Sequence, residues 1–229
     1  MKIMRAVFFL ILFVFVHANV EAEDLSFSDT DRIKIIEKPI YYSKKRELLS
    51  LQYLKDRYNI IQSRPTIKPI MIVLHYTDGG TVNSIYDYFN KDEIEEARKF
   101  NKKESKLNVS SHYLVDRDGT IYHLIADSLF ARHVIGLNYC SIGIENIGNE
   151  KEPLTNKQII SNTQLIKYLA KKYPIKYLIG HSEYSQFRNT RLWKEKDPKY
   201  FTYKSDPGKA FLFSVRKSLT DLKFLYKPE

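Results

Sequence analysis

Two short, strongly apolar segments, each followed directly by a histidine, constrain the fold of this chain more than any other feature. Residues 70–74 (IMIVL) precede His75, and residues 175–180 (IKYLIG) precede His181. Runs of this length, rich in β-branched residues, are typical of strands that are buried on both faces of a sheet. We therefore expect both histidines at strand ends, at one rim of the sheet, where α/β folds place their ligands.

Segments with helical spacing alternate with these strands. Residues 43–58 place leucines and tyrosines on one helical face, and residues 155–173 open with a capping box formed by Thr155 and Gln158. Apolar positions from 211 to 222 predict a closing helix. Strands and helices interleave without a repeat or an interdomain linker, so we predict a single α/β domain with a mixed central β-sheet flanked by helices.

Further strands are expected between the two histidines. Residues 110–124 alternate apolar and polar positions around an Asp-Gly turn, which predicts a β-hairpin. Residues 141–147 (SIGIENI) predict another strand. Residues 81–89 favour a short helix, and the highly charged residues 91–106 are interpreted as a solvated helix or a surface insertion.

The first 22 residues have the pattern of an export signal. Lys2 and Arg5 precede an unbroken apolar run over residues 6–16, and small residues follow at Ala18 and Ala22. A run of this length is too short to cross a bilayer comfortably, because a spanning helix needs about 20 residues. We interpret residues 1–22 as a signal peptide, with an uncleaved membrane anchor as the alternative.

Composition narrows the classes of partner. The chain has 229 residues and a formal net charge of +10, which would attract nucleic acid, anionic lipid or an acidic polymer such as a cell wall. Lysines spread over solvated faces would give the same total. No arginine-rich run or aromatic-interleaved basic segment argues for nucleic acid, so we expect no nucleic-acid partner. Cys140 is the only cysteine, which excludes an intramolecular disulfide, and we interpret it as structural.

The two strand-end histidines are suited to zinc. A catalytic zinc ion takes three protein ligands and keeps one open position, so a third Cys, His, Asp or Glu is required. Asp206 stands at a loop-to-helix junction before a proline, two residues after Lys204, and alternate residues of an extended segment face the same side. Taken alone, Lys204 and Asp206 would be a surface ion pair; with the histidines they predict a metal ligand beside a cation.

Five segments, taken in order, resemble a known family. They are IVLHYT (72–77), SHYLVDRDGT (111–120), SIGIE (141–145), GHSE (180–183) and KSDPG (204–208). Together they resemble the zinc-dependent N-acetylmuramoyl-L-alanine amidases of the peptidoglycan recognition protein superfamily, in its bacterial branch. The resemblance extends over residues 67–222.

The resemblance implies a fold, a reaction and a set of site residues. It places the zinc ligands at His75, His181 and Asp206, in a surface cleft at the strand ends of a mixed sheet, and the catalytic groups at Glu145 and Lys204. The implied substrate is peptidoglycan or a muropeptide, cleaved at the amide between N-acetylmuramic acid and L-alanine during peptidoglycan breakdown or turnover. Residues 23–66 then form an N-terminal arm and helix, and residues 67–229 the amidase catalytic domain.

The sequence also departs from the family pattern. Some members carry a catalytic tyrosine before the histidine of the hairpin, whereas Ser111 stands there in this chain, so Glu145 should hold the role of base. The aromatic, basic stretch 184–203 lengthens the connection to Asp206 and either contacts substrate, through Trp193 and Tyr200, or folds on itself. The residues expected to contact substrate are His112, His133, Asn138 and Trp193.

Two other functions were weighed against the amidase. A peptidoglycan-binding module without catalysis typically lacks part of the zinc set, whereas all three ligands, Glu145 and Lys204 are present here. A zinc hydrolase of the same fold that acts on another amide stays open. We expect a monomer exported to the periplasm, or to the extracellular space and cell wall, without stable membrane insertion once the signal is cleaved.

Cleavage of the signal can be tested by intact-mass measurement of the exported protein. Cleavage after Ala18 or Ala22 gives a mature chain that begins at Asn19 or Glu23. A mass that retains Met1 would instead identify the segment as an N-terminal membrane anchor.

Overall fold

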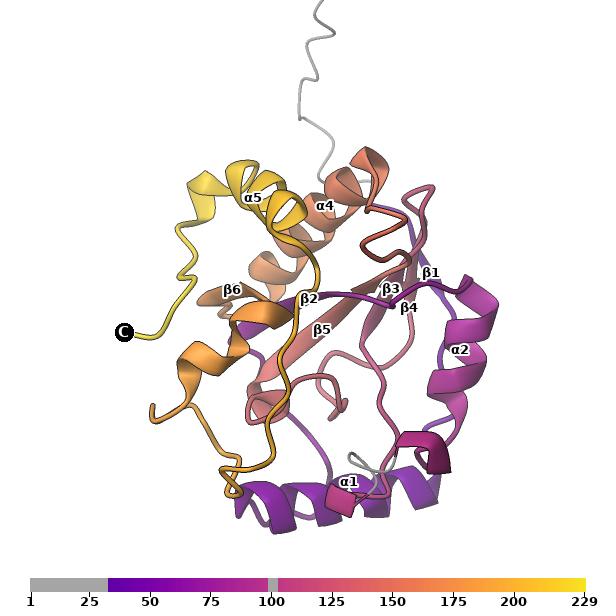
Figure 1. Ribbon diagram of the computed structural model, residues 1–229, viewed down its shortest axis with the longest axis vertical. Helices are drawn as coiled ribbons and strands as arrows, with labels where there is room; N and C mark the ends of the chain where they lie inside the picture. Colours follow the sequence, from indigo (N-terminus) through magenta and orange to yellow (C-terminus); the bar gives the residue numbers. More distant parts are fainter. Residues whose placement is uncertain (1–32, 99–102) are drawn as a thin grey trace, which may run out of the picture.

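One mixed sheet organises the computed structural model, which describes residues 33–98 and 103–229 (Figure 1). Within these residues the strand order is β1-β4-β3-β5-β2-β6, with β3 and β4 antiparallel and the other neighbours parallel. The strands are β1 (Ile35–Glu37), β2 (Met71–Tyr76), β3 (Tyr113–Val115), β4 (Ile121–His123), β5 (Ser141–Asn146) and β6 (Tyr177–Gly180). The predicted α/β class with a mixed sheet is confirmed, and the signal segment lies outside the described residues.

Helices begin where the sequence carries caps. The helices are α1 (Lys44–Tyr58), α2 (Val82–Asn90), α4 (Asn156–Lys172) and α5 (Lys209–Lys217). The Ser43 side chain accepts from the Arg46 N–H to cap α1, and Thr155 and Gln158 form the predicted capping box of α4. The final helix ends at Lys217, earlier than predicted, and only a short 3₁₀ turn, Thr220–Leu222, follows it. The charged residues 91–106 lie between α2 and β3, and their described part includes the 3₁₀ turn Glu96–Arg98.

The two faces of the sheet bury different partners. Ile72 and Leu74 of β2 pack in a cluster with α4 and α5, which lie together at the top of Figure 1. Met71 and Val73 point to the opposite face, where they pack against Tyr184 and other residues of the loops. Because side chains alternate along a strand, His75 falls on the same face as Val73. The face without α4 and α5 therefore carries the strand-end histidine.

Helix α1 is packed into the same structural unit as the sheet. Tyr53 and Tyr58 are buried in a cluster with Phe130. Arg57 pairs through two nitrogens with Glu195, whose side chain is fully buried, at 3.1 and 2.7 Å. Deleting one partner of a buried ion pair costs about 3–5 kcal/mol, because the other charge is left uncompensated. The helix therefore holds the long 184–203 connection in place. In the described part of the chain, no helix is long and apolar enough to cross a membrane.

Removing α1 should unfold the domain. A chain that begins at residue 67 loses three buried side chains of α1, Tyr53, Leu54 and Tyr58, each worth about 1.5–3 kcal/mol. With the Arg57 pairing, the sum is comparable with the whole stability of a typical domain, about 5–15 kcal/mol. A chain beginning at residue 33 should show a cooperative urea transition and the shorter one should show none. A folded 67–229 chain would contradict this role for the helix.

Candidate active site

The register of three parallel strands brings the principal site residues into one row. Leu74 of β2 pairs with Gly180, the last residue of β6, so His75 on β2 and His181 at the start of the following 3₁₀ helix come next on neighbouring segments. On the other side of β2, His75 pairs with Glu145 of β5. Paired residues of adjacent strands project from the same face of a sheet. Glu145, His75 and His181 therefore lie side by side on the face opposite α4 and α5.

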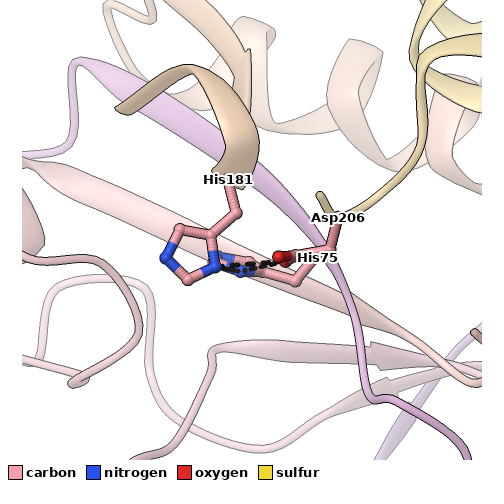
Figure 2. A group of neighbouring side chains, drawn as sticks. All are labelled: His75, His181 and Asp206. Atoms are coloured by element: carbon pink, nitrogen blue, oxygen red, sulfur yellow. Dashed lines mark hydrogen bonds and ion pairs between the residues drawn. The ribbon is translucent and has the colours of Figure 1, made fainter. Parts of the chain in front are cut away.

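Asp206 completes a triangle of donor atoms with the two histidines. The Nδ1 atoms of His75 and His181 are 2.9 Å apart, and the Asp206 Oδ2 lies 3.2 Å from the first and 3.1 Å from the second (Figure 2). Three ligands of a tetrahedral ion bound at about 2.0–2.1 Å lie about 3.3 Å from one another. Two imidazole nitrogens and a carboxylate oxygen also match the donor set of catalytic zinc sites. The residues fit a zinc ion.

Asp206 reaches the histidines although 25 residues separate it from His181. The Ser182 N–H donates to the Asp206 carbonyl at 2.9 Å, which joins the segment to the end of β6. Pro207 packs on Gly180, where an added Cβ would lie 2.8 Å from the proline Cδ. The absence of a side chain at Gly180 thus allows the close approach that positions the third ligand.

The electrostatics of the triangle favour metal-binding forms of its members. Burial and the neighbouring His181 lower the pKa of His75 to about 4, so its imidazole is neutral at pH 7. Burial alone would raise the pKa of Asp206, but the adjacent His181 and His75 hold it well below its ordinary value. A neutral imidazole and an ionised carboxylate are the forms that coordinate a metal ion.

A third histidine supports the ring of His75. The Nε2 of His75 lies 3.1 Å from the Nδ1 of His133, and the two rings meet edge to face. If the Nδ1 of His75 held a metal ion, its Nε2 would carry the proton and donate to His133. His133 was predicted to contact substrate; the structure places it in the cleft wall, beside the candidate metal ligand His75.

Glu145 has a free oxygen in the cleft. Among the described residues, its Oε2 has no hydrogen-bond partner. Burial raises the pKa of this carboxyl well above its ordinary value, and the nearby Asp206 carboxylate adds to the rise against the charges of Lys204 and Arg98. Lys204 is exposed and lines the same cleft. The cleft thus combines the donor triangle, a carboxyl able to hold a proton, and a cation.

The cleft has a volume of about 600 Å³, and two of the expected substrate contacts line it. These are His133 and Asn138; Tyr200 also lines it but is buried, and its hydroxyl accepts from Arg132 at 2.9 Å. Four further tyrosines of the cleft were not anticipated from the sequence, namely Tyr53, Tyr76, Tyr88 and Tyr203. Tyr76 follows His75 on β2, which was the one available signal for it.

His112 and Trp193 lie elsewhere than expected. His112 is fully buried; its Nδ1 accepts from the Gly143 N–H at 3.0 Å, and its Nε2 donates to the Leu129 carbonyl at 2.9 Å. Both ring nitrogens are therefore engaged with backbone, which argues against the predicted contact with substrate. Trp193 stacks on Tyr184 and covers Gly136, so the long loop folds on itself at this position.

Comparison with known proteins agrees with this geometry. The family profile described as N-acetylmuramoyl-L-alanine amidase matches residues 65–209. The chain belongs to this family. Family membership identifies the activity as N-acetylmuramoyl-L-alanine amidase activity on peptidoglycan, in hydrolysis or turnover of the cell wall. The family assignment made from the five segments is therefore confirmed. No curated protein matches the chain.

Solved structures of several other proteins are similar to this one. The N-acetylmuramoyl-L-alanine amidase endolysin LysCS from Clostridium intestinale URNW is 22% identical, with a TM-score of 0.51, over 84% of this chain and 97% of that one. The Ph2119 endolysin, from a bacteriophage of Thermus scotoductus MAT2119, is 22% identical with a TM-score of 0.49, over 81% and 98%. The PGRP-SA protein of Apis mellifera is 18% identical with a TM-score of 0.43, over 70% and 98%.

The donor triangle predicts one zinc ion per chain. After dialysis against trace zinc, metal analysis of the full chain should give about one zinc per molecule. Asp206→Ala should weaken zinc binding at least about 100-fold, because it removes one of three ligands. Asp78→Ala is the matched control, since Asp78 lines the same cleft outside the triangle. A folded wild-type chain without bound zinc would contradict the site.

Proposed function

We propose that this chain is an exported, zinc-dependent amidase that hydrolyses the amide between the lactyl group of N-acetylmuramic acid and L-alanine of the stem peptide. The observation that carries the proposal is the single row formed by Glu145, His75 and His181, closed by Asp206 on the same face. The row supports the proposal because the Glu145 carboxyl lies beside three side chains whose ligand atoms converge and could hold a metal ion. Export is proposed from the N-terminal signal pattern.

The chain's residues divide the work at the reacting amide. His75, His181 and Asp206 would hold the metal. A zinc ion bound there would supply Lewis-acid polarisation of the scissile carbonyl and a lowered pKa for water. The His75–His133 contact would keep the proton of His75 on Nε2 and its Nδ1 lone pair directed at the metal.

Glu145 is proposed as the general base and then the general acid. Burial raises the pKa of this carboxyl, which favours its holding a proton between the two transfers. The unpartnered Oε2 would take a proton from the attacking water and return it to the leaving amine of L-alanine. Because no described residue hydrogen-bonds this oxygen, it is available for that exchange.

Lys204 is proposed to stabilise the charge that develops on the carbonyl oxygen. It stands two residues before Asp206, lines the cleft and interacts electrostatically with His75 and Glu145. A cation near the developing charge lowers the barrier, because the charge is larger in the transition state than in the substrate.

Replacing Glu145 separates catalysis from metal binding. Glu145→Gln keeps the shape of the side chain but cannot accept a proton, so turnover of muropeptides should fall by about 10²–10⁴-fold. Zinc content should stay at the wild-type level, because Glu145 is outside the donor triangle. Turnover followed by liquid chromatography, together with metal analysis of the same sample, measures both quantities.

The control and the product identify the reaction. Glu150→Gln changes an exposed carboxyl outside the cleft and should leave turnover unchanged. Mass spectrometry of digested peptidoglycan should reveal free stem peptides that begin with L-alanine. Substantial turnover by Glu145→Gln would remove this residue from the proposed role, whereas muropeptides that still carry their stems would point to cleavage of another amide.

A further inference from the structure

A series of hydrogen bonds runs from helix α1 to the loop that carries His133. The Tyr58 hydroxyl accepts from the Asn138 side-chain amide at 2.9 Å and from the Gly136 N–H at 3.1 Å. The side-chain oxygen of Asn138 in turn accepts the backbone N–H groups of His133 and Val134, each at 2.8 Å. One tyrosine hydroxyl and one amide thus hold the loop in shape.

The series continues through His133 to a residue of the donor triangle. The His133 ring packs directly on Gly143, where an added Cβ would lie 2.8 Å from the ring. Its Nδ1 lies 3.1 Å from the Nε2 of His75, and its Nε2 lies 3.4 Å from the Ser141 carbonyl. The ring is therefore fixed between β5 and His75 in one orientation.

Because these hydrogen bonds are buried, the loss of any one of them should disturb the position of the loop that carries His133. Asn138 is fully buried and Tyr58 is 3% exposed, so water cannot readily replace a lost hydrogen bond. The Tyr58 ring is held by edge-to-face contacts with Tyr53, at 5.3 Å between centroids, and with Tyr139, at 6.0 Å. The hydroxyl therefore has little freedom to follow a displaced amide.

We propose that Tyr58 is a positioning residue for the metal ligand His75. Through Asn138 it holds His133 where the Nδ1 of that ring accepts the Nε2–H of His75, and this keeps the other nitrogen of His75 directed into the triangle. Tyr58 precedes the segment matched by the family profile, which begins at residue 65. The inference rests on the proposed zinc site. It adds that Tyr58, a residue outside the matched segment, contributes to the zinc affinity of that site.

The test is the zinc affinity of Tyr58→Phe, measured by competition with a chelator on the full chain. Changes in the partners of metal-ligating histidines typically weaken metal binding by about 10–100-fold. Because Tyr58 acts on His75 through two intervening residues, Asn138 and His133, we expect zinc affinity to fall by an amount at the lower end of this range, about tenfold. Tyr139→Phe is the matched control: it removes a neighbouring hydroxyl that donates to the Leu192 carbonyl, and zinc affinity should change less than twofold.

A double-mutant cycle distinguishes positioning from a general loss of stability. If Tyr58 acts through His133, then Tyr58→Phe should have no further effect on zinc affinity in a His133→Leu background. A merely structural effect would weaken binding by the same factor in both backgrounds. Should Tyr58→Phe fail to fold, Asn138→Ala breaks the same link from the other side and should weaken zinc binding at least as much.

The outcomes separate this inference from the proposed function. A folded wild-type chain that binds no zinc would overturn the metal site and the inference together. Wild-type binding with unchanged affinity in Tyr58→Phe, or equal losses in both backgrounds of the cycle, would overturn the inference and leave the amidase proposal intact. A tenfold loss that disappears in the His133→Leu background supports it.

Discussion

The parallel pairing of β2 with β5 on one side and β6 on the other determines where the groups of the site lie. Because side chains project alternately from the two faces of a sheet, the register that pairs Leu74 with Gly180 also aligns His75 with His181. The pairing of His75 with Glu145 adds the carboxyl to the same row. Helices α4 and α5 cover the opposite face, which leaves this row open to the cleft.

The site contains buried ionisable groups, and most of them are compensated by a neighbouring side chain. A buried carboxylate and closely spaced imidazoles are tolerated only where a partner compensates them. Asp206 is compensated by His181 and His75, and His75 by His133. Among the described residues, no hydrogen-bond partner compensates the Glu145 Oε2, and burial together with the Asp206 carboxylate raises the pKa of this carboxyl. This difference between the two carboxyls agrees with the proposed division of roles, in which Asp206 binds the metal ion and Glu145 transfers protons.

Much of this arrangement could be predicted from sequence, because the signals were local. Apolar runs ending in His75 and His181, and the capping box of α4, gave strands, a helix and the rim of the sheet. What escaped prediction depends on contacts between distant segments. Nothing near His112 reveals that backbone groups occupy both its nitrogens, and nothing in 43–58 reveals that Tyr58 reaches Asn138. Strand β1 was missed because three residues give too little periodicity.

The strand register of β2 and β6 also determines at which stage of folding the site can form. The two histidines are 106 residues apart in sequence, and a slip of one residue between their strands would send one imidazole to the helical face. Such distant pairing forms late, because the entropy of closing long loops must be met first. An unfolded chain would hold no preformed metal site. Binding of a metal ion would therefore follow folding and report that the sheet has closed in the correct register.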